Sequence, residues 1–394
     1  MSKISIERLR SICAKHGFNL HTLVPPKLTS QSEAEKMVNK WCDQGFHAEL
    51  TYLSRTRERS GASKLLETAF RSILVLGVRY GVTSHGPLEL PQDFGRVARF
   101  AWGQDYHRVL RTRVAKLLES IASESGASFK HKICCDATSL YEKPLAAAAG
   151  LGFIGKNSLL IVPTLGSYLF LAEVLWDLDV LGYQATVSPS CSCGTCRRCV
   201  DACRSEALSS ARYLDARRCV AYLTVEKKGS FSWQEREWLG EWIFGCDICQ
   251  EACPYNADSS QAGDADFPEF RASAGVGPFL DLRRILEIQD RRGFEALFSG
   301  TALMRCGRER LLRNAAVVAG NSGSPSLLDI LLSKAQQDPS ALVREHAFWA
   351  LCKLKSKCDN RDVARIKEAL AQGVSDPDER VAGEVAALME SEWI

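Results

Sequence analysis

The spacing of apolar and polar residues predicts strands and helices mixed through the first half of the chain. Residues 72–80, SILVLGVRY, form an almost continuous apolar run, which is typical of a strand covered on both faces. Residues 157–178 predict two strands around a turn at 163–166. Helical spacing occurs over 105–123 and 140–149. These elements predict a domain of the α/β or α+β class.

From about residue 280 onward the pattern is helical, and it repeats. The segment DPSALVREHAFWAL begins at Asp338 and the related segment DPDERVAGEVAAL begins at Asp376, which gives a period of 38 residues. Helical pairs of this length stack as HEAT-like repeats. Two matched units also fit a plain helical cap, so that alternative stays open.

We therefore predict an α+β chain with three consecutive domains. The first is a mixed α/β domain over residues 1–185. The second is a cysteine-rich segment over residues 186–258, and the third, residues 259–394, is a linker followed by HEAT-like helices. A length of 394 residues is long for one domain and is consistent with this division.

The overall charge excludes a wholly basic nucleic-acid coat, since the formal net charge is only +3. Any contact with nucleic acid would come from a local patch. One short predicted helix, residues 301–314, carries four arginines against a single glutamate and could contact phosphates, although a solvated helix face is the alternative. The four are Arg305, Arg308, Arg310 and Arg313. No run of about 18 apolar residues could span a membrane, so we expect a cytoplasmic protein.

The cysteines predict a metal-binding segment. A long cytoplasmic chain with sixteen cysteines is better explained by metal binding than by disulfides, and eight of them lie between Cys193 and Cys253. The first motif has the spacing of a two-cluster ferredoxin, in which three close thiolates hold one [4Fe-4S] cluster and the fourth crosses to the other. Its members are Cys193, Cys196, Cys199 and Cys203.

A second motif, Cys246-x2-Cys249-x3-Cys253-Pro254, has isoleucine at position 243, where its own first cysteine would stand. The crossing rule assigns to cluster A the residues Cys193, Cys196, Cys199 and Cys253. Cluster B then takes Cys203, Cys246 and Cys249, and Cys219 becomes its fourth ligand. Cys191 is left without a cluster. A zinc ribbon is the alternative, but it would leave several of these cysteines without a role.

Two glycine-containing matches are weak. The segment 150–155 fits G-x-G-x-x-G, but an alanine-rich helical stretch precedes it where a dinucleotide site needs a strand. Gly155-Lys156-Asn157-Ser158 resembles the end of a phosphate-binding loop, but the upstream glycine spacing is wrong. We expect a tight turn between a helix and a strand, where backbone amides can approach a ligand.

Two polar segments could supply protons. Asp136 follows a predicted strand and precedes a helix, so it is either a helix cap or an acid at a strand end. A partly buried aspartate there could hold its proton at neutral pH and donate it. A predicted helix begins with three adjacent side chains that can carry protons, Asp105, Tyr106 and His107. They form either the edge of a functional site or a surface helix start that Asp105 caps.

Taken together, these segments resemble the epoxyqueuosine reductase family from about residue 45 to 320. The resemblance rests on RVARFAWGQDYH, CDATSLYEKPLAAAAGLGFIGKNSLL, GSYLFLAEV, AYLTVE and FGCDICQEACP, together with both cysteine motifs. The family is in turn similar to the catalytic core of corrinoid reductive dehalogenases. The resemblance implies a cobalamin-binding domain with a nitroreductase-like core, two [4Fe-4S] clusters and reduction of epoxyqueuosine to queuosine at the wobble position of tRNA.

The resemblance also implies roles for individual residues. Asp136 would be the proton donor, with His107 and Tyr106 beside it. Lys143 would lie near the modified nucleoside, and the four arginines would bind tRNA. Cobalamin would be contacted by Arg59, Arg99, Asp136, Ser158 and Leu160.

The resemblance further implies three properties of the whole protein. A flavodoxin or ferredoxin would supply electrons, the anticodon stem-loop would be the part of the tRNA recognised, and we expect a monomer. The alternatives are a dehalogenase-like reductase of a small molecule and a non-catalytic electron carrier.

Overall fold

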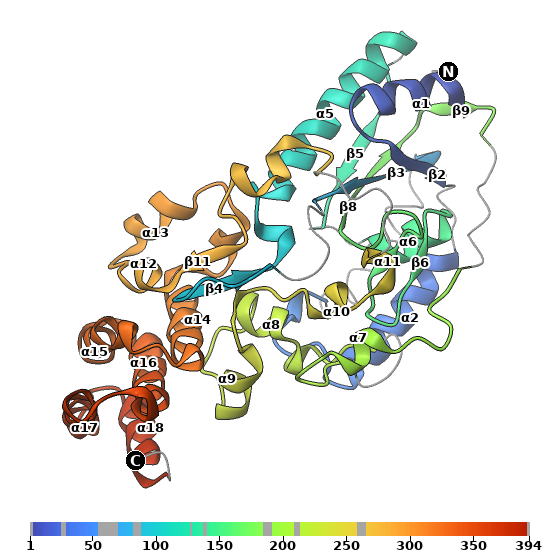
Figure 1. Ribbon diagram of the computed structural model, residues 1–394. Coiled ribbons are helices and arrows are strands. Elements are labelled where there is room, and N and C mark those ends of the chain that lie inside the picture. Colours follow the sequence, from blue (N-terminus) through green and yellow to red (C-terminus); the bar gives the residue numbers. More distant parts are fainter. Residues whose placement is uncertain are drawn as a thin grey trace. The chain divides into compact units, whose positions relative to one another are not determined.

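The computed structural model describes residues 3–24, 29–53, 70–81, 88–126, 128–136, 140–183, 191–208, 213–257 and 265–391. It divides into two compact units, each assembled from three stretches of sequence (Figure 1). Unit 1 comprises residues 1–87, 103–217 and 247–274, and unit 2 comprises 88–102, 218–246 and 275–394. This division differs from the three consecutive domains that we expected, because the cysteine-rich segment is shared between the units.

Unit 1 has an α/β composition. Its strands are β1 (Lys3–Ser5), β2 (Leu20–Val24), β3 (Ser72–Arg79), β5 (His131–Cys134), β6 (Phe153–Ile154), β7 (Leu160–Ile161), β8 (Leu169–Trp176) and β9 (Asp179–Leu181). Its helices are α1 (Ile6–Lys15), α2 (Thr29–Asp43), α5 (Tyr106–Ser125), α6 (Glu142–Ala148), α7 (Arg198–Asp201), α10 (Ile248–Glu251) and α11 (Pro254–Ala257).

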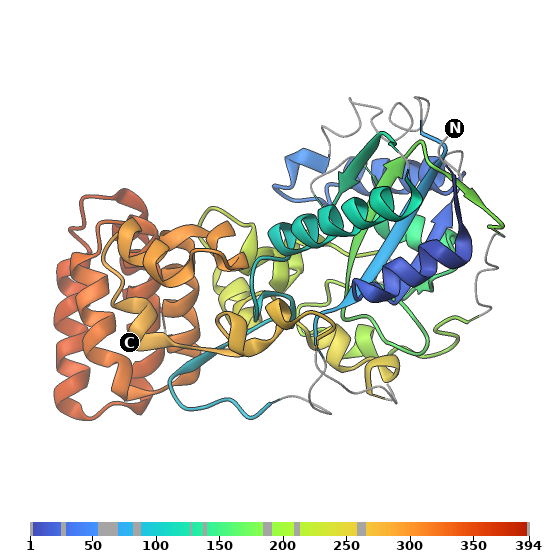
Figure 2. The same cartoon turned by 90° about the horizontal axis from the view of Figure 1, so that it is seen from above.

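The central sheet of unit 1 has the order β2-β3-β8-β5, and all its neighbours are antiparallel. Helices α1 and α5 lie on one face and α6 on the other (Figures 1 and 2). Six consecutive residues of β3, 73–78, are buried, which confirms the prediction of a doubly covered strand. On the α6 face, Ile73 and Val75 of β3 pack in one core cluster with Leu145 of α6.

The end of α6 and the following strand confirm the predicted helix-to-strand turn. Helix α6 ends at Ala148 and β6 begins at Phe153. A side chain at Gly152 would put its Cβ 2.2 Å from the carbonyl oxygen of Ile161, so the close approach of these two backbone segments requires glycine there.

Unit 2 is mostly helical. Its sheet has the order β10-β4-β11, from the strands β4 (Phe94–Val97), β10 (Trp242–Phe244) and β11 (Phe279–Asp281). Its helices are α8 (Val220–Val225), α9 (Trp233–Leu239), α12 (Leu282–Leu286), α13 (Arg291–Phe298), α14 (Gly307–Ser322), α15 (Leu328–Gln337), α16 (Ala341–Leu354), α17 (Asn360–Gly373) and α18 (Glu379–Glu390).

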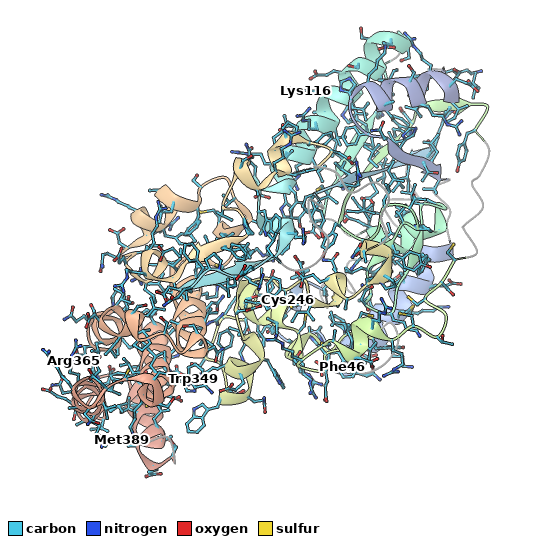
Figure 3. The ribbon with its side chains drawn as sticks, in the orientation of Figure 1. Phe46, Lys116, Cys246, Trp349, Arg365 and Met389 are labelled. Carbon is cyan, nitrogen blue, oxygen red and sulfur yellow. The ribbon has the colours of Figure 1, made fainter. Side chains whose placement is uncertain are left out.

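The repeated aspartates of the C-terminal region make equivalent ion pairs. Arg308 of α14 contacts Asp338 after α15 at 2.5 Å, and Arg344 of α16 contacts Asp376 after α17 at 2.7 Å. Helix α16 packs against α14, α15 and α18, and its Trp349 is fully buried among these helices (Figure 3). Each arginine therefore joins the start of one helical pair to the loop that follows the pair. None of the helices in the described part of the chain is both long and apolar enough to cross a membrane.

Candidate functional site

A group of four polar side chains gathers where β5 ends and α5 begins. Strand β5 ends at Cys134, and Asp136 follows it in the left-handed conformation with φ of 55°. The cap of α6 is Tyr141, so Asp136 does not cap that helix. Instead, the backbone N–H of Asp136 donates to the Oε1 atom of Glu142 at 2.5 Å. This hydrogen bond holds the segment after β5 in a conformation that side chains rarely adopt.

The first turn of α5 supplies the partners of the Asp136 carboxylate. His107 lies between two aspartates, with its Nδ1 atom 2.9 Å from Oδ1 of Asp105 and its Nε2 atom 3.1 Å from Oδ2 of Asp136. The Tyr106 hydroxyl donates to the same Oδ2 atom. The Tyr106 ring stacks on Phe170 of β8, with a centroid distance of 4.4 Å. Asp105 also caps α5 through the His107 N–H, so both of its expected roles are present.

The charges in this group correct one expectation. The hydrogen bonds to Asp105 and Asp136 raise the pKa of His107 to about 9. The hydrogen bond from His107 lowers the pKa of Asp136, and the hydrogen bond from Tyr106 lowers it further by a smaller amount. Asp136 is therefore ionised at neutral pH, whereas we expected a carboxyl that keeps its proton. The resting proton is on His107, and 58 % of the Asp136 side chain is exposed to solvent.

Two further carboxyl groups lie behind Asp136, and the sequence analysis missed them. Glu173 is fully buried in β8, and burial together with the neighbouring Glu142 carboxyl raises its pKa. Burial also raises the pKa of Glu142 to about 7. For Glu173 the sequence did contain a signal, because it is the single acidic residue inside the apolar run of residues 169–176.

The expected cluster A cysteines line a single pocket in unit 1. It holds about 320 Å³, including space open to solvent, and is lined by Lys156, Asn157, Ile161, Cys193, Cys196, Cys199, Cys253, Pro254 and Tyr255. Four thiols around one cavity is the arrangement that a [4Fe-4S] cluster requires. Within the described residues, no three acidic, histidine or cysteine side chains form a group that could hold a single metal ion.

A polar network ties the second cysteine motif to the sheet of unit 1. The side-chain Oδ1 of Asn256 accepts a hydrogen bond from the Ser167 N–H at 2.7 Å, and the Ser167 hydroxyl donates to Gln250 at 2.9 Å. All three residues are buried. Ser167, two residues before β8, thus fixes the segment that contributes Cys253 to the pocket.

The cysteines expected for cluster B come from both units. Of the cysteines expected for cluster B, Cys203 and Cys249 belong to unit 1, and Cys219 and Cys246 belong to unit 2. All four are partly exposed. Cys191 is exposed and is not among the residues that line the pocket.

The expected cobalamin contacts have different environments. Ser158 has φ of 62°, and its buried Oγ atom has no hydrogen-bond partner in the described part of the chain. An unpartnered buried hydroxyl fits a residue that hydrogen-bonds a bound cofactor. The backbone oxygen of Ser158 accepts from Lys143 Nζ at 3.1 Å. Leu160 is only 4 % exposed and packs in the α6 core cluster. Arg99 is buried in unit 2 over Trp102, and Arg59 lies outside the described residues.

The prediction that four arginines form a basic face does not hold for most of them, because they make contacts inside unit 2. Arg313 is fully buried and donates to the carbonyl oxygens of Leu223, Lys227 and Gly229. Arg308 is held by Asp338, as described above.

The other two arginines differ in exposure. Arg310 donates to the carbonyl oxygens of Val225 and Glu226. Arg305, whose side chain is 54 % exposed, pairs with Glu226 at 2.9 Å. The arginines mainly satisfy carbonyl groups within unit 2, because α14 is buried on nearly all sides.

Comparisons with known proteins follow the same motifs. A family model described as "4Fe-4S double cluster binding domain" matches residues 192–256, and one described as "Epoxyqueuosine reductase QueG, DUF1730" matches residues 59–137. The epoxyqueuosine reductase of Xanthomonas campestris is 35% identical over 350 residues, covering 87% of this chain and 94% of that protein. The epoxyqueuosine reductase of Pseudomonas aeruginosa is 36% identical over 326 residues, covering 81% and 87%.

A solved structure has the same fold. It is the crystal structure of an epoxyqueuosine reductase with an epoxyqueuosine-modified tRNA-Tyr stem loop, with a TM-score of 0.82 and 24% identity, and the match covers 98% of this chain and 97% of that chain. The double-cluster match agrees with the ferredoxin-like spacing of the cysteines and with the thiol-lined pocket. On the level of identity and the length covered by the two curated relatives, the chain belongs to the epoxyqueuosine reductase family.

Proposed function

We propose that this protein reduces the epoxide of epoxyqueuosine in tRNA to the alkene of queuosine. The observation that carries the proposal is the exposed Asp136 carboxylate, hydrogen-bonded to His107 and Tyr106 in a chain whose relatives are epoxyqueuosine reductases. The related structure with a modified tRNA stem loop supports tRNA as the substrate. We infer that the anticodon stem-loop presents the nucleoside to this site, since RNA-modifying proteins favour unstacked bases in loops.

The reaction needs both electrons and protons. Removal of the epoxide oxygen as water consumes two electrons and two protons, and the product carbons form a double bond. Each [4Fe-4S] cluster passes one electron at a time. Cobalamin, when bound, supplies a reduced metal centre for attack on the epoxide carbon, which no side chain can provide.

The residues around Asp136 provide the first of the two protons, and solvent water supplies the second. An alkoxide is a poor leaving group, so an acid must protonate the oxygen as the C–O bond breaks. His107 holds a proton below about pH 9, and Asp136 lies within hydrogen-bond reach of it. We propose that Asp136 receives the proton from His107 and delivers it to the oxygen, while Tyr106 fixes the carboxylate.

The remaining assignments are proposals of the same kind. Cluster A would be held by the four cysteines of the pocket, and cluster B by Cys203, Cys219, Cys246 and Cys249. Ser158 would hold cobalamin through its unpartnered hydroxyl, with Arg59 and Arg99 as further contacts. Leu160 would contribute only backbone, because its side chain is in the core.

Lys143 would contact the nucleoside, and Arg305 is the arginine of the predicted patch exposed enough to contact tRNA phosphates. We further infer HEAT-like repeats in α14–α18, a nitroreductase-like core in unit 1, a cytoplasmic monomer and an external donor such as a flavodoxin or ferredoxin.

A direct assay tests the function. Protein purified without oxygen is supplied with cobalamin, a strong one-electron reductant and tRNA carrying epoxyqueuosine. Digestion and mass spectrometry of the nucleosides should show queuosine, with one oxygen atom lost per nucleoside. Unchanged epoxyqueuosine in the presence of bound cobalamin and about eight iron atoms per chain would contradict the proposal.

A further inference from the structure

The loop of residues 155–158, which resembled a phosphate-binding motif, lies against the cluster A pocket. The backbone N–H of Lys156 donates to the Sγ atom of Cys193 at 3.4 Å. The Lys156 ammonium donates to the carbonyl oxygens of Gly194 and Cys196, at 2.8 Å each. One lysine therefore ties the loop that carries two expected cluster ligands to the turn after β6.

The next residue places a buried donor at the same pocket. Asn157 lines the pocket and is only 4 % exposed. Its Oδ1 atom accepts from the Leu159 N–H at 3.3 Å, which fixes the orientation of the amide. Its Nδ2 atom is buried and has no hydrogen-bond partner within the described residues. Buried N–H groups are almost always paired, so this donor indicates an acceptor that belongs in the pocket.

We propose that Asn157 and Lys156 set the reduction potential of cluster A. The Asn157 Nδ2 donates to a thiolate or sulfide sulfur of the cluster, and Lys156 places a positive charge and an N–H donor on the Cys193–Cys196 loop. Reduction adds one negative charge to the cluster, so donors and cations nearby stabilise the reduced form more than the oxidised form. The two residues raise the potential above that of the same cluster without them. This inference rests on the assignment of cluster A in the proposed function.

The effect should be larger for Asn157 than for Lys156. Asn157 is buried, where electrostatic interactions are weakly screened, whereas Lys156 is partly exposed. The same loop continues to Ser158, whose carbonyl accepts from Lys143, an electrostatic neighbour of Asp136. One short loop thus contacts the cluster pocket through Lys156 and Asn157, and Lys143 through Ser158.

Redox titration of the holoenzyme, followed by EPR of the reduced clusters, tests the proposal. Asn157→Asp keeps the acceptor for Leu159 but removes the donor and adds negative charge. It should lower the equilibrium constant for reduction of one cluster at least about tenfold, which is about 59 mV for one electron. Lys156→Met should shift the same cluster in the same direction by a smaller factor. The second cluster should keep its potential in both variants.

Two controls separate tuning from general damage. Lys156→Arg keeps the charge and should stay close to the wild-type potential. Lys132→Met removes one positive charge from the exposed Lys132 of β5 and should change neither cluster.

Three results would overturn the proposal. The first is unchanged potentials in Asn157→Asp and Lys156→Met with about eight irons retained. The second is an equal shift of both clusters, because a local contact cannot produce it. The third is wild-type protein without iron, which would also overturn the cluster assignment, so the two failures are distinguishable.

Discussion

His107 Nε2 lies 3.1 Å from Oδ2 of Asp136, and this contact links a protonated imidazole to a solvent-exposed carboxylate. The other ring nitrogen of His107 contacts Asp105, so the imidazole is held in one orientation by two carboxylates. Both contacts stabilise the imidazolium, which explains why the pKa of His107 rises and that of Asp136 falls. Proton delivery by Asp136 therefore depends on a neighbour that is still charged.

The first prediction concerns pH dependence. His107 is protonated below its pKa of about 9, so single-turnover epoxide reduction should fall as the pH rises through about 9. Asp105→Asn removes the largest cause of the raised pKa and should move this decline to lower pH. The pH–rate profiles of the two proteins measure the shift, and coincident profiles would argue against His107 as the proton store. The contribution of protonated His107 to the free energy of unfolding also decreases as the pH rises. It is complete below the unfolded pKa of about 6.5 and is lost as the pH rises through about 9.

A second prediction concerns the buried carboxyl pair. The folded pKa values of Glu142 and Glu173 are raised, so the stability linked to both is present below the unfolded pKa of about 4.3 and is lost at higher pH. For Glu142 the loss occurs as the pH rises through about 7. Glu173→Gln should make the free energy of unfolding less dependent on pH between about 5.5 and 8. Urea denaturation at both pH values measures this, with the exposed Glu119→Gln as the matched control. Parallel pH dependence in wild type and Glu173→Gln would rule out the pair as its source.

The third prediction compares two arginines of the same region. Arg313→Met removes a buried guanidinium from three carbonyl oxygens and from the Phe231 ring, 3.8 Å away. We expect a loss of about 3 to 5 kcal/mol in the free energy of unfolding. Arg305→Met breaks a largely exposed ion pair and should cost at most about 1 kcal/mol. Equal losses in denaturant titrations would contradict the structural role assigned to Arg313.

A fourth prediction concerns the cysteine next to the first motif. Cys191 is exposed and outside the pocket, so Cys191→Ser should keep about eight irons per chain. Cys196→Ser removes a pocket thiol and should reduce the content to about four or to an incomplete cluster. Iron analysis of anaerobically purified protein measures both. Loss of iron from Cys191→Ser would place this thiol among the ligands.

The sequence was informative where a signal is local. Strand β3 and helix α5 follow from apolar spacing, and the Asp105 cap follows from its position before that helix. The cysteine spacing predicted the four thiols that line the pocket. A tight loop can bind only one side of a cluster with three thiolates, so the fourth ligand comes from the other motif.

The sequence was misleading where long-range partners decide. The arginines of α14 read as a basic face, but residues 311–320 of this helix are all buried, and the carbonyl groups that hold Arg313 come from residues 223–229. Similarly, the ionised state of Asp136 depends on His107, which is 29 residues earlier in the chain. No local pattern contains such partners.

Single-turnover reduction of epoxyqueuosine tRNA by Asp136→Asn tests proton delivery through Asp136. This variant keeps the size of the side chain but cannot pass a proton from His107 to the epoxide oxygen. We expect normal iron content, cobalamin binding and tRNA binding, with the rate of queuosine formation at least about a hundredfold lower. Formation of queuosine at the wild-type rate by this variant would contradict proton delivery through Asp136.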